Sequence, residues 1–174
     1  MNRKFLFLSL MLFMLMFTSC KKKEIINDYP SLDKNTIIEY ISGEEALEKI
    51  ESNYTGIIVF GFKECPWCQA CISHVDYVAK EKGYKEVFYL DIKDMRDNEE
   101  SPERQIYLSI FEHIKEDIDN PGKIFAPTVV VFKDGKVTGY NMGTVESHQR
   151  VDGTLPVMTD EQIKELREIY RNIF

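Results

Sequence analysis

The chain has 174 residues with 22 basic and 29 acidic side chains, so its formal net charge is −7. This length fits one domain with a short appendage, and a content of 44% apolar and 29% charged residues excludes a disordered chain. The acidic balance argues against general nucleic-acid binding, which needs a basic face, and four cysteines in this arrangement exclude a disulfide-stapled miniprotein.

The first twenty residues have the pattern of a bacterial lipoprotein leader. Two basic residues precede thirteen residues, 5–17, of which only one is polar, and this run is shorter than a membrane span needs. Small residues stand directly before Cys20 in a pattern that resembles a lipobox. The resemblance implies that residues 1–19 are a signal peptide and that Cys20 carries a lipid. A plain signal peptide or an uncleaved anchor would also fit this pattern.

A leader of this kind predicts that the rest of the chain lies outside the cytoplasmic membrane, where disulfides persist. Residues 20–35 are predicted to be a lipid anchor and tether, because they are polar and lack a sustained period. The basic triplet after Cys20 would lie beside anionic lipid headgroups. The folded domain is accordingly predicted over residues 36–174.

Strand and helix patterns alternate through this domain. The run from 56 to 62 is almost entirely apolar, which is typical of a strand buried on both faces. Further strands are predicted over residues 36–41, 86–92, 127–132 and 137–142. Helices are predicted after Ser42, from the cysteine motif to Lys82, from Ser101 to Ile118 and after Thr159. This order predicts an α/β domain with one mixed sheet.

The motif Cys65-Pro66-Trp67-Cys68 directly follows a predicted strand and opens a helix. A cysteine at a helix N-terminus lies at the positive end of the helix dipole, which favours its nucleophilic thiolate form. Pro66 suits the first helical turn, because its missing N–H has no partner there in any case. The spacing brings Cys68 within reach of a mixed disulfide on Cys65, so Cys65 is predicted to attack and Cys68 to resolve. Trp67 is predicted to lie exposed as an apolar contact for a protein substrate.

From residue 36 to the end, the chain resembles the thioredoxin superfamily. The cysteine motif, the strand opening Ala126-Pro127-Thr128 about sixty residues later and a following hairpin that ends at Gly143 carry this resemblance. It implies a thioredoxin-like mixed β-sheet flanked by helices. It also implies a cis peptide between Ala126 and Pro127, in a loop that faces the cysteines and aligns an extended substrate. Within the superfamily, the chain is most similar to small Gram-positive thioredoxin-like proteins, including the bacteriocin transport accessory proteins.

Three features depart from the pattern of thioredoxins proper. Pro66 and Trp67 stand where these proteins have Gly-Pro. Val59 and Tyr89 take the places of the buried aspartate and lysine that form the usual proton-relay pair. Residues 93–125 form a longer helix-bearing segment before the cis-proline strand, which could cover or reshape the substrate groove.

Two residues on the helix of the cysteine motif leave alternatives open. Cys71 could pack as a small apolar side chain, act as a second redox partner or bind a metal. His74 could complete a zinc set, although a surface or half-buried position is the simpler interpretation. His113 and His148 are predicted to be surface residues.

The leading hypothesis is a thiol–disulfide oxidoreductase that is anchored to the membrane and acts on protein cysteines outside the cytoplasm. It would exchange electrons with protein thiols or disulfides and with a membrane redox partner, and it needs no cofactor or metal, because the electrons travel as thiol–disulfide exchange. One alternative is a metal-binding lipoprotein that uses the clustered cysteines. Another is a non-catalytic accessory protein that keeps the fold as a binding scaffold.

Overall fold

The computed structural model describes residues 24–119 and 122–174. Among the described residues, five strands and four of the named helices follow one another in the order that the sequence predicts, and the short helix α4 is additional. Their bounds are β1 (Ile38–Tyr40), α2 (Gly43–Glu51), β2 (Gly56–Gly61), α3 (Pro66–Glu81), β3 (Val87–Asp91), α4 (Lys93–Asp97), α5 (Arg104–Ile114), β4 (Thr128–Lys133), β5 (Lys136–Met142) and α6 (Asp160–Ile173).

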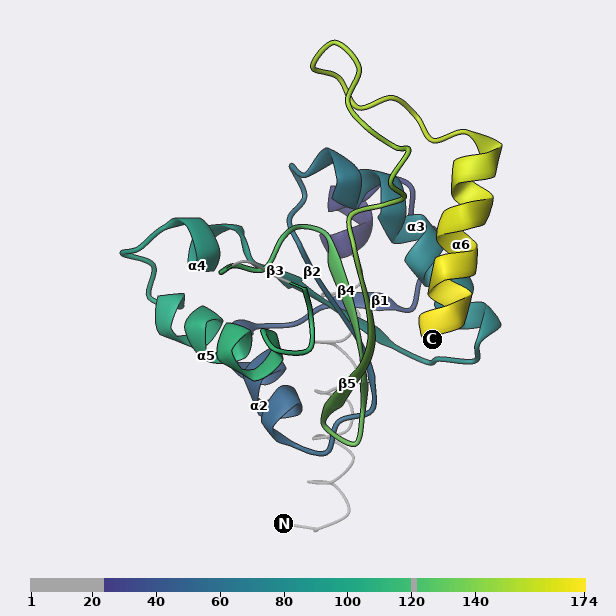
Figure 1. Cartoon of the computed structure of the whole chain (residues 1–174). Coiled ribbons are helices and arrows are strands. Elements are labelled where there is room, and N and C mark those ends of the chain that lie inside the picture. The colour runs from purple at the N-terminus through teal and green to yellow at the C-terminus, as the bar shows by residue number, and fades with distance from the viewer. Residues whose placement is uncertain (1–23, 120–121) are drawn as a thin grey trace, which may run out of the picture.

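The strands form one mixed sheet in the order β1-β3-β2-β4-β5 (Figure 1). β1, β3 and β2 run parallel, whereas β4 is antiparallel to both β2 and β5. All six residues of β2 are buried, as their continuous apolar run predicts. A mixed five-stranded sheet flanked by helices is a thioredoxin-like fold, and this part of the prediction is confirmed.

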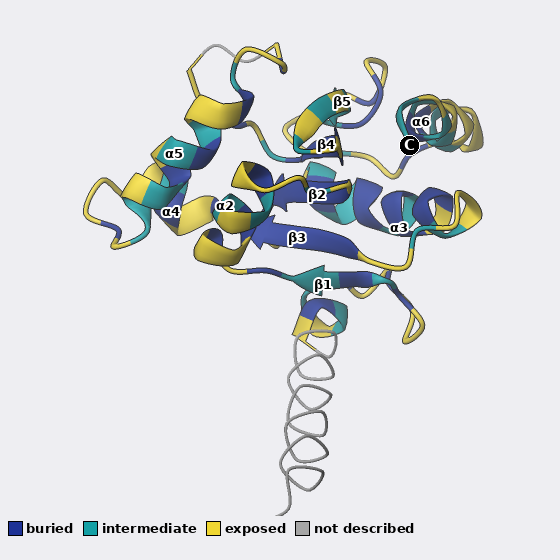
Figure 2. Ribbon diagram, turned by 90° about the horizontal axis from the view of Figure 1, so that it is seen from below, coloured by how far each residue is buried: buried dark blue, intermediate teal, exposed yellow. Residues whose placement is uncertain are grey.

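Helices cover both faces of the sheet (Figure 2). One cover, here called the α3 layer, consists of α3, α6 and residues 24–32, whereas the other, the α5 layer, consists of α2, α4 and α5. Successive side chains of a strand point to opposite faces, so Ile57 and Val59 enter the core beneath the α3 layer and Ile58 and Phe60 the other. Each layer therefore has its own hydrophobic core.

Capping residues begin α2 and α6 where the sequence predicts. The Ser42 hydroxyl accepts the N–H of Glu45 at 3.2 Å while the Glu45 carboxylate accepts the N–H of Ser42 at 3.0 Å. Thr159 and Gln162 form the same reciprocal pair at the start of α6. Each pair satisfies two backbone donors that a helix N-terminus would otherwise leave without partners.

The predicted tether of residues 20–35 is wrong from residue 24 onward. Residues 24–28 are helical, and Ile25, Tyr29 and Leu32 are buried in the α3 layer. Only Ile25 of these three lies in the helical turn, and three apolar residues are too few to show a sustained period in the sequence. The predicted signal peptide 1–19 and the lipid site Cys20 lie outside the described residues.

The segment between β3 and β4 differs in detail from its prediction. A single helix is predicted from Ser101 to Ile118, but the observed helix α5 is shorter than that. Ile118 is buried in the turn that follows α5. The helix α4 was not predicted, because five residues are too few to show a helical period. Within the described residues, none of the helices has the length and apolar character needed to cross a membrane.

Candidate active site

The two cysteines of the motif lie where β2 ends and α3 begins. Cys65 is the N-cap of α3 and Pro66 is its first residue, as predicted from the sequence. The Cys65 sulfur accepts the backbone N–H of Cys68 at 3.3 Å. Both thiols are free and buried, with exposed fractions of 3% for Cys65 and zero for Cys68. The fold thus brings the pair together at the positive end of a helix.

The two thiols differ sharply in their electrostatics. Hydrogen bonding to the Cys68 side chain lowers the pKa of Cys65 to about 7, and the backbone N–H groups of Cys68 and Trp67 add to this effect. Burial, followed by hydrogen bonding to Cys65, raises the pKa of Cys68 well above its usual range. Cys65 is therefore the thiol that ionises near neutral pH, whereas Cys68 stays protonated.

The loop before β4 faces this pair. The peptide between Ala126 and Pro127 is cis, which confirms the expectation from the resemblance. The Cys65 thiol donates to the Ala126 carbonyl oxygen at 3.4 Å, across 61 residues of sequence. Thr128 is fully buried and its hydroxyl donates to the Phe125 carbonyl oxygen at 2.8 Å, so this side chain shapes the loop instead of facing solvent.

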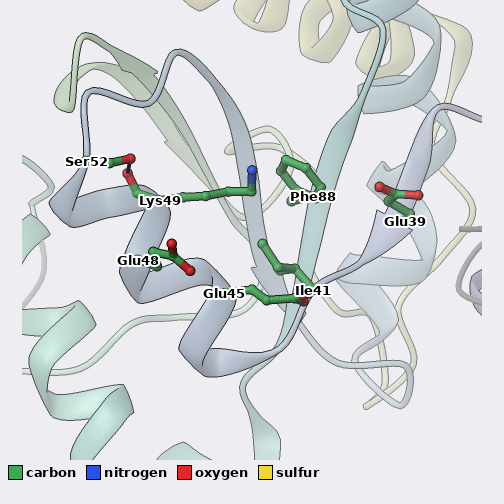
Figure 3. Close-up of a pocket in the computed structure, with 7 residues that line it drawn as sticks. All are labelled: Glu39, Ile41, Glu45, Glu48, Lys49, Ser52 and Phe88. Atoms are coloured by element: carbon green, nitrogen blue, oxygen red, sulfur yellow. Dashed lines mark hydrogen bonds between the residues drawn. The ribbon is translucent and has the colours of Figure 1, made fainter. Parts of the chain in front are cut away.

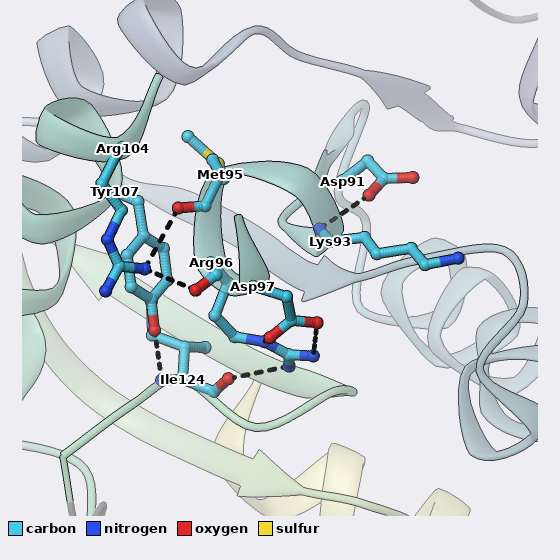
Figure 4. Close-up of polar contacts among 8 residues, drawn as sticks. All are labelled: Asp91, Lys93, Met95, Arg96, Asp97, Arg104, Tyr107 and Ile124. Atoms are coloured by element: carbon cyan, nitrogen blue, oxygen red, sulfur yellow. Dashed lines mark hydrogen bonds and ion pairs between the residues drawn. The ribbon is translucent and has the colours of Figure 1, made fainter. Parts of the chain in front are cut away.

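Residues of the α5 layer hold this loop from its other side (Figure 4). The Arg96 guanidinium donates to the Ile124 carbonyl oxygen at 3.2 Å, and the Ile124 N–H donates to the Tyr107 hydroxyl at 2.9 Å. Arg104 donates to the Arg96 carbonyl oxygen. Both backbone groups of Ile124, two residues before Ala126, are thereby fixed. The extra segment 93–125 braces the loop, a role that its sequence does not reveal.

Arg96 also acts on Cys65 through its charge. Its guanidinium side chain is only 11% exposed and pairs with the Asp97 carboxylate at 2.7 Å. After the hydrogen bonds named above, the positive charge of Arg96 is a further contribution that lowers the pKa of Cys65. An arginine more than thirty residues away in the chain gives no sequence signal of this contact.

Trp67 is half-buried, so the prediction of an exposed side chain needs correction. The loop after β5 covers it, with the indole N–H donating to the His148 carbonyl oxygen at 3.5 Å and the Arg150 guanidinium 4.8 Å from the ring centroid. His148 itself is 1% exposed, against the prediction of a surface residue. Its ring bonds to Thr144 at 2.9 Å and to the Pro156 carbonyl at 2.7 Å, which ties the two ends of this loop together.

The other ambiguous residues take structural positions. Cys71 is fully buried, its thiol donates to the Cys68 carbonyl oxygen at 3.6 Å and burial raises its pKa to about 12. His74 is half-buried beside Arg167, whose Nε lies 3.3 Å from its ring nitrogen. His113 is exposed, as predicted. Among the described residues, no three His, Cys, Asp or Glu side chains converge in a way that could hold a metal ion.

Two of the hollows in the described part of the chain differ in their position relative to the cysteine motif. One adjoins the cysteine motif and is largely apolar, with Pro66, Ala70, Leu155, Val157 and Met158 among its lining residues. The other lies beside α2, where Lys49 reaches over the Phe88 ring among three glutamates (Figure 3). This second hollow contains no cysteine. Of these two, the first adjoins Pro66 of the motif and is the better placed to contact a molecule that reacts at Cys65.

Comparisons with known proteins assign no activity to the chain. A thioredoxin of Plasmodium falciparum is 21% identical, and its match covers 75% of this chain and 97% of the thioredoxin with a TM-score of 0.41. The sequence matches no family profile, and none of the curated proteins matches it. The sheet topology and the cis-proline loop beside the paired cysteines identify the fold of the chain as thioredoxin-like.

Proposed function

We propose that the protein is a thiol–disulfide oxidoreductase in which Cys65 attacks a substrate disulfide and Cys68 resolves the mixed disulfide. The observation that carries this proposal is the asymmetry of the pair. Cys65 has a pKa of about 7 and contacts the cis-proline loop, whereas the protonated Cys68 lies one helical turn further along α3. A nucleophile with a pKa near ambient pH is the most effective attacking thiol.

The exchange needs no cofactor. The Cys65 thiolate forms a bond to one sulfur of the substrate, and the other substrate sulfur leaves with the electron pair and takes up a proton. Cys68 then attacks Cys65, which releases the first substrate sulfur as a thiol and leaves a Cys65–Cys68 disulfide. The same steps in reverse oxidise a substrate dithiol.

The surface around the pair supports a protein substrate. Pro66 is exposed, Phe125 beside the cis-proline is 41% exposed and Val157 in the apolar hollow is 92% exposed. We infer that Ala126 and Pro127, in the loop before β4, align an extended substrate segment through strand-like backbone hydrogen bonds. Half-buried Trp67 contributes the edge of its ring instead of an open platform.

The proposal also includes a location outside the cytoplasmic membrane, a lipid anchor on Cys20 and exchange of electrons with a membrane redox partner. The leader pattern of residues 1–19 supports this location. The proposed relationship to Gram-positive thioredoxin-like proteins, including the bacteriocin transport accessory group, rests on the sequence motifs alone. Metabolic labelling with a fatty acid, compared between wild type and Cys20→Ala, tests the anchor.

The test of the chemistry is a titration of the purified full chain in glutathione buffers of graded potential, followed by acid quench, alkylation and mass spectrometry. We expect a reversible Cys65–Cys68 disulfide with Cys71 unchanged. A midpoint near that of thioredoxin would identify a reductant, and a much higher midpoint an oxidant. If no disulfide cycles, the protein is not an oxidoreductase.

A second test uses Cys68→Ser, which removes the resolving thiol. In cells this variant should accumulate mixed disulfides through Cys65, visible as adducts that a reductant releases. The double variant that also carries Cys65→Ser is the control and should form none. Equal adducts in both variants would contradict the assigned roles.

A further inference from the structure

Two buried tyrosine hydroxyls meet behind the cysteine pair. Tyr29, in the segment before β1, and Tyr89, in the middle of β3, are both completely buried. Their hydroxyl groups hydrogen-bond to each other, and their ring centroids lie 5.2 Å apart. A buried hydroxyl is costly unless it has a partner, so the pair satisfies two groups that an apolar core would normally exclude.

The Tyr89 hydroxyl lies next to the resolving thiol. A Cβ placed on Gly61 would overlap the Tyr89 hydroxyl and would stand 2.9 Å from the Cys68 sulfur. The hydroxyl and the thiol therefore share the small space beside Gly61, at the end of β2. A side chain at this position would separate them, so glycine is what allows this approach.

The resolving step requires that the buried Cys68 thiol lose its proton. Cys68 must lose its proton to attack Cys65, yet burial raises its pKa strongly. No carboxylate occurs in β2, which precedes the motif. The ionisable groups that interact electrostatically with Cys68 or with the tyrosine pair are two thiols, two phenols and one carboxylate. They are Cys65, Cys71, Tyr40, Tyr170 and Asp91.

We propose that the Tyr29–Tyr89 pair stabilises the thiolate that develops on Cys68 during the resolving step. The Tyr29 hydroxyl donates to the Tyr89 oxygen, and the Tyr89 hydroxyl donates to the Cys68 sulfur as negative charge builds up there. Hydrogen bonds to a charged acceptor are about twice as strong as those to a neutral one. Tyr89 thus contacts the reacting sulfur, whereas Tyr29 acts through Tyr89 as a positioning residue. The inference rests on the oxidoreductase function proposed above.

The step balances without a further reactant. Cys68 gives up its proton, its sulfur forms a bond to the Cys65 sulfur, and the bond from Cys65 to the substrate sulfur breaks. The electron pair and one proton leave with the substrate, which departs as a thiol. Both tyrosines remain protonated throughout, consistent with the raised pKa that burial gives to each of them.

The inference also explains why the segment before β1 packs against the active-site loop. The Gln69 side-chain amide donates to the Asp28 carbonyl oxygen at 2.9 Å and to the Lys63 carbonyl oxygen at 2.7 Å. The Lys63 ammonium pairs with the Asp28 carboxylate at 3.3 Å. These contacts hold Tyr29 in place, so residues predicted to be a tether complete the site instead.

The test follows the two steps separately with 5,5′-dithiobis(2-nitrobenzoate) on the reduced full chain carrying Cys20→Ala, because Cys20 would otherwise release a thionitrobenzoate of its own. Attack by Cys65 releases one thionitrobenzoate, and attack by Cys68 on the resulting mixed disulfide releases a second. We expect Tyr89→Phe to slow the second release about tenfold and to move its pH midpoint upward, with the first release unchanged. Tyr29→Phe should act in the same direction more weakly. Tyr54→Phe, a matched control in the α5 layer, should change neither phase.

The outcomes separate the two proposals. A parent Cys20→Ala chain that shows no second release, or whose product has no Cys65–Cys68 disulfide by mass spectrometry, overturns the oxidoreductase function. A normal parent chain with an equal second release in Tyr89→Phe overturns the role of the tyrosine pair. Should Tyr89→Phe fail to fold, as judged by circular dichroism and by the first release, Tyr29→Phe decides, and an unchanged second release there overturns the role as well.

Discussion

The two layers that cover the sheet bury very different groups. The α3 layer encloses three thiols and three tyrosines, whereas the α5 layer is built of aliphatic side chains, phenylalanine, one methionine and Tyr107. Polar groups are expensive to bury, and a core that serves only stability avoids them. This comparison associates the proposed chemistry with the α3 layer, while residues of the α5 layer brace the cis-proline loop from its other side.

The largest effect that this comparison of the two layers predicts is the loss of activity when the nucleophile Cys65 is replaced. Cys65→Ser should abolish disulfide reduction in an insulin-precipitation assay, with a decrease of at least about a thousandfold, because a hydroxyl does not ionise near neutral pH. Cys71→Ala is the control, because this thiol is completely buried and donates to a backbone carbonyl oxygen, not to the Cys65 sulfur. Comparable losses in both variants would show that the thiols of this layer act as one group.

A cavity in the α5 layer should lower the stability of the protein without changing the pKa of Cys65. Ile110 is completely buried there, and Ile110→Ala should lower the free energy of unfolding by about 2 to 5 kcal/mol in urea titrations. Leu108→Ala, on the same helix with 38% of its side chain exposed, should change it by less than about 0.5 kcal/mol. A shifted pKa of Cys65 in the Ile110 variant would mean that the two layers are coupled.

The pH dependence of alkylation measures the asymmetry within the α3 layer. Because the thiolate is the reactive form and the pKa of Cys65 is about 7, its rate with iodoacetamide should rise with pH and level off above that value. Below it, the rate should fall about tenfold for each pH unit. Cys68 and Cys71 should react only after unfolding. Modification of Cys68 at a similar rate in the native protein would contradict the assignment.

The smallest expected effect comes from Arg96, which links the α5 layer to the cis-proline loop and to Cys65. Arg96→Gln removes a positive charge near Cys65 and weakens the hold on Ile124, so the pKa of Cys65 should rise and its alkylation near pH 7 should slow about threefold. Arg171→Gln is the control, because this arginine pairs with Glu81 on the far side of α3. An unchanged pH profile in Arg96→Gln would leave this residue with a bracing role alone.

Much of the fold could be predicted, because strands, caps and turns depend on residues close together in the chain. The apolar run of β2, the capping boxes at Ser42 and Thr159 and the position of Cys65 at a helix start are of this kind. The short helix α4 and the helical turn at residues 24–28 were missed, because neither is long enough to show a period.

The sequence by itself determined the mixed sheet, the paired cysteines and the loop that the resemblance placed opposite them. Only the tertiary structure decided what surrounds the thiols. It joins Tyr29 to Tyr89 across 60 residues and Arg96 to Ile124 across 28, and it buries the His148 ring within the loop that covers Trp67. These contacts depend on how whole elements pack, and no local pattern encodes which distant side chain will fill the space beside a given sulfur.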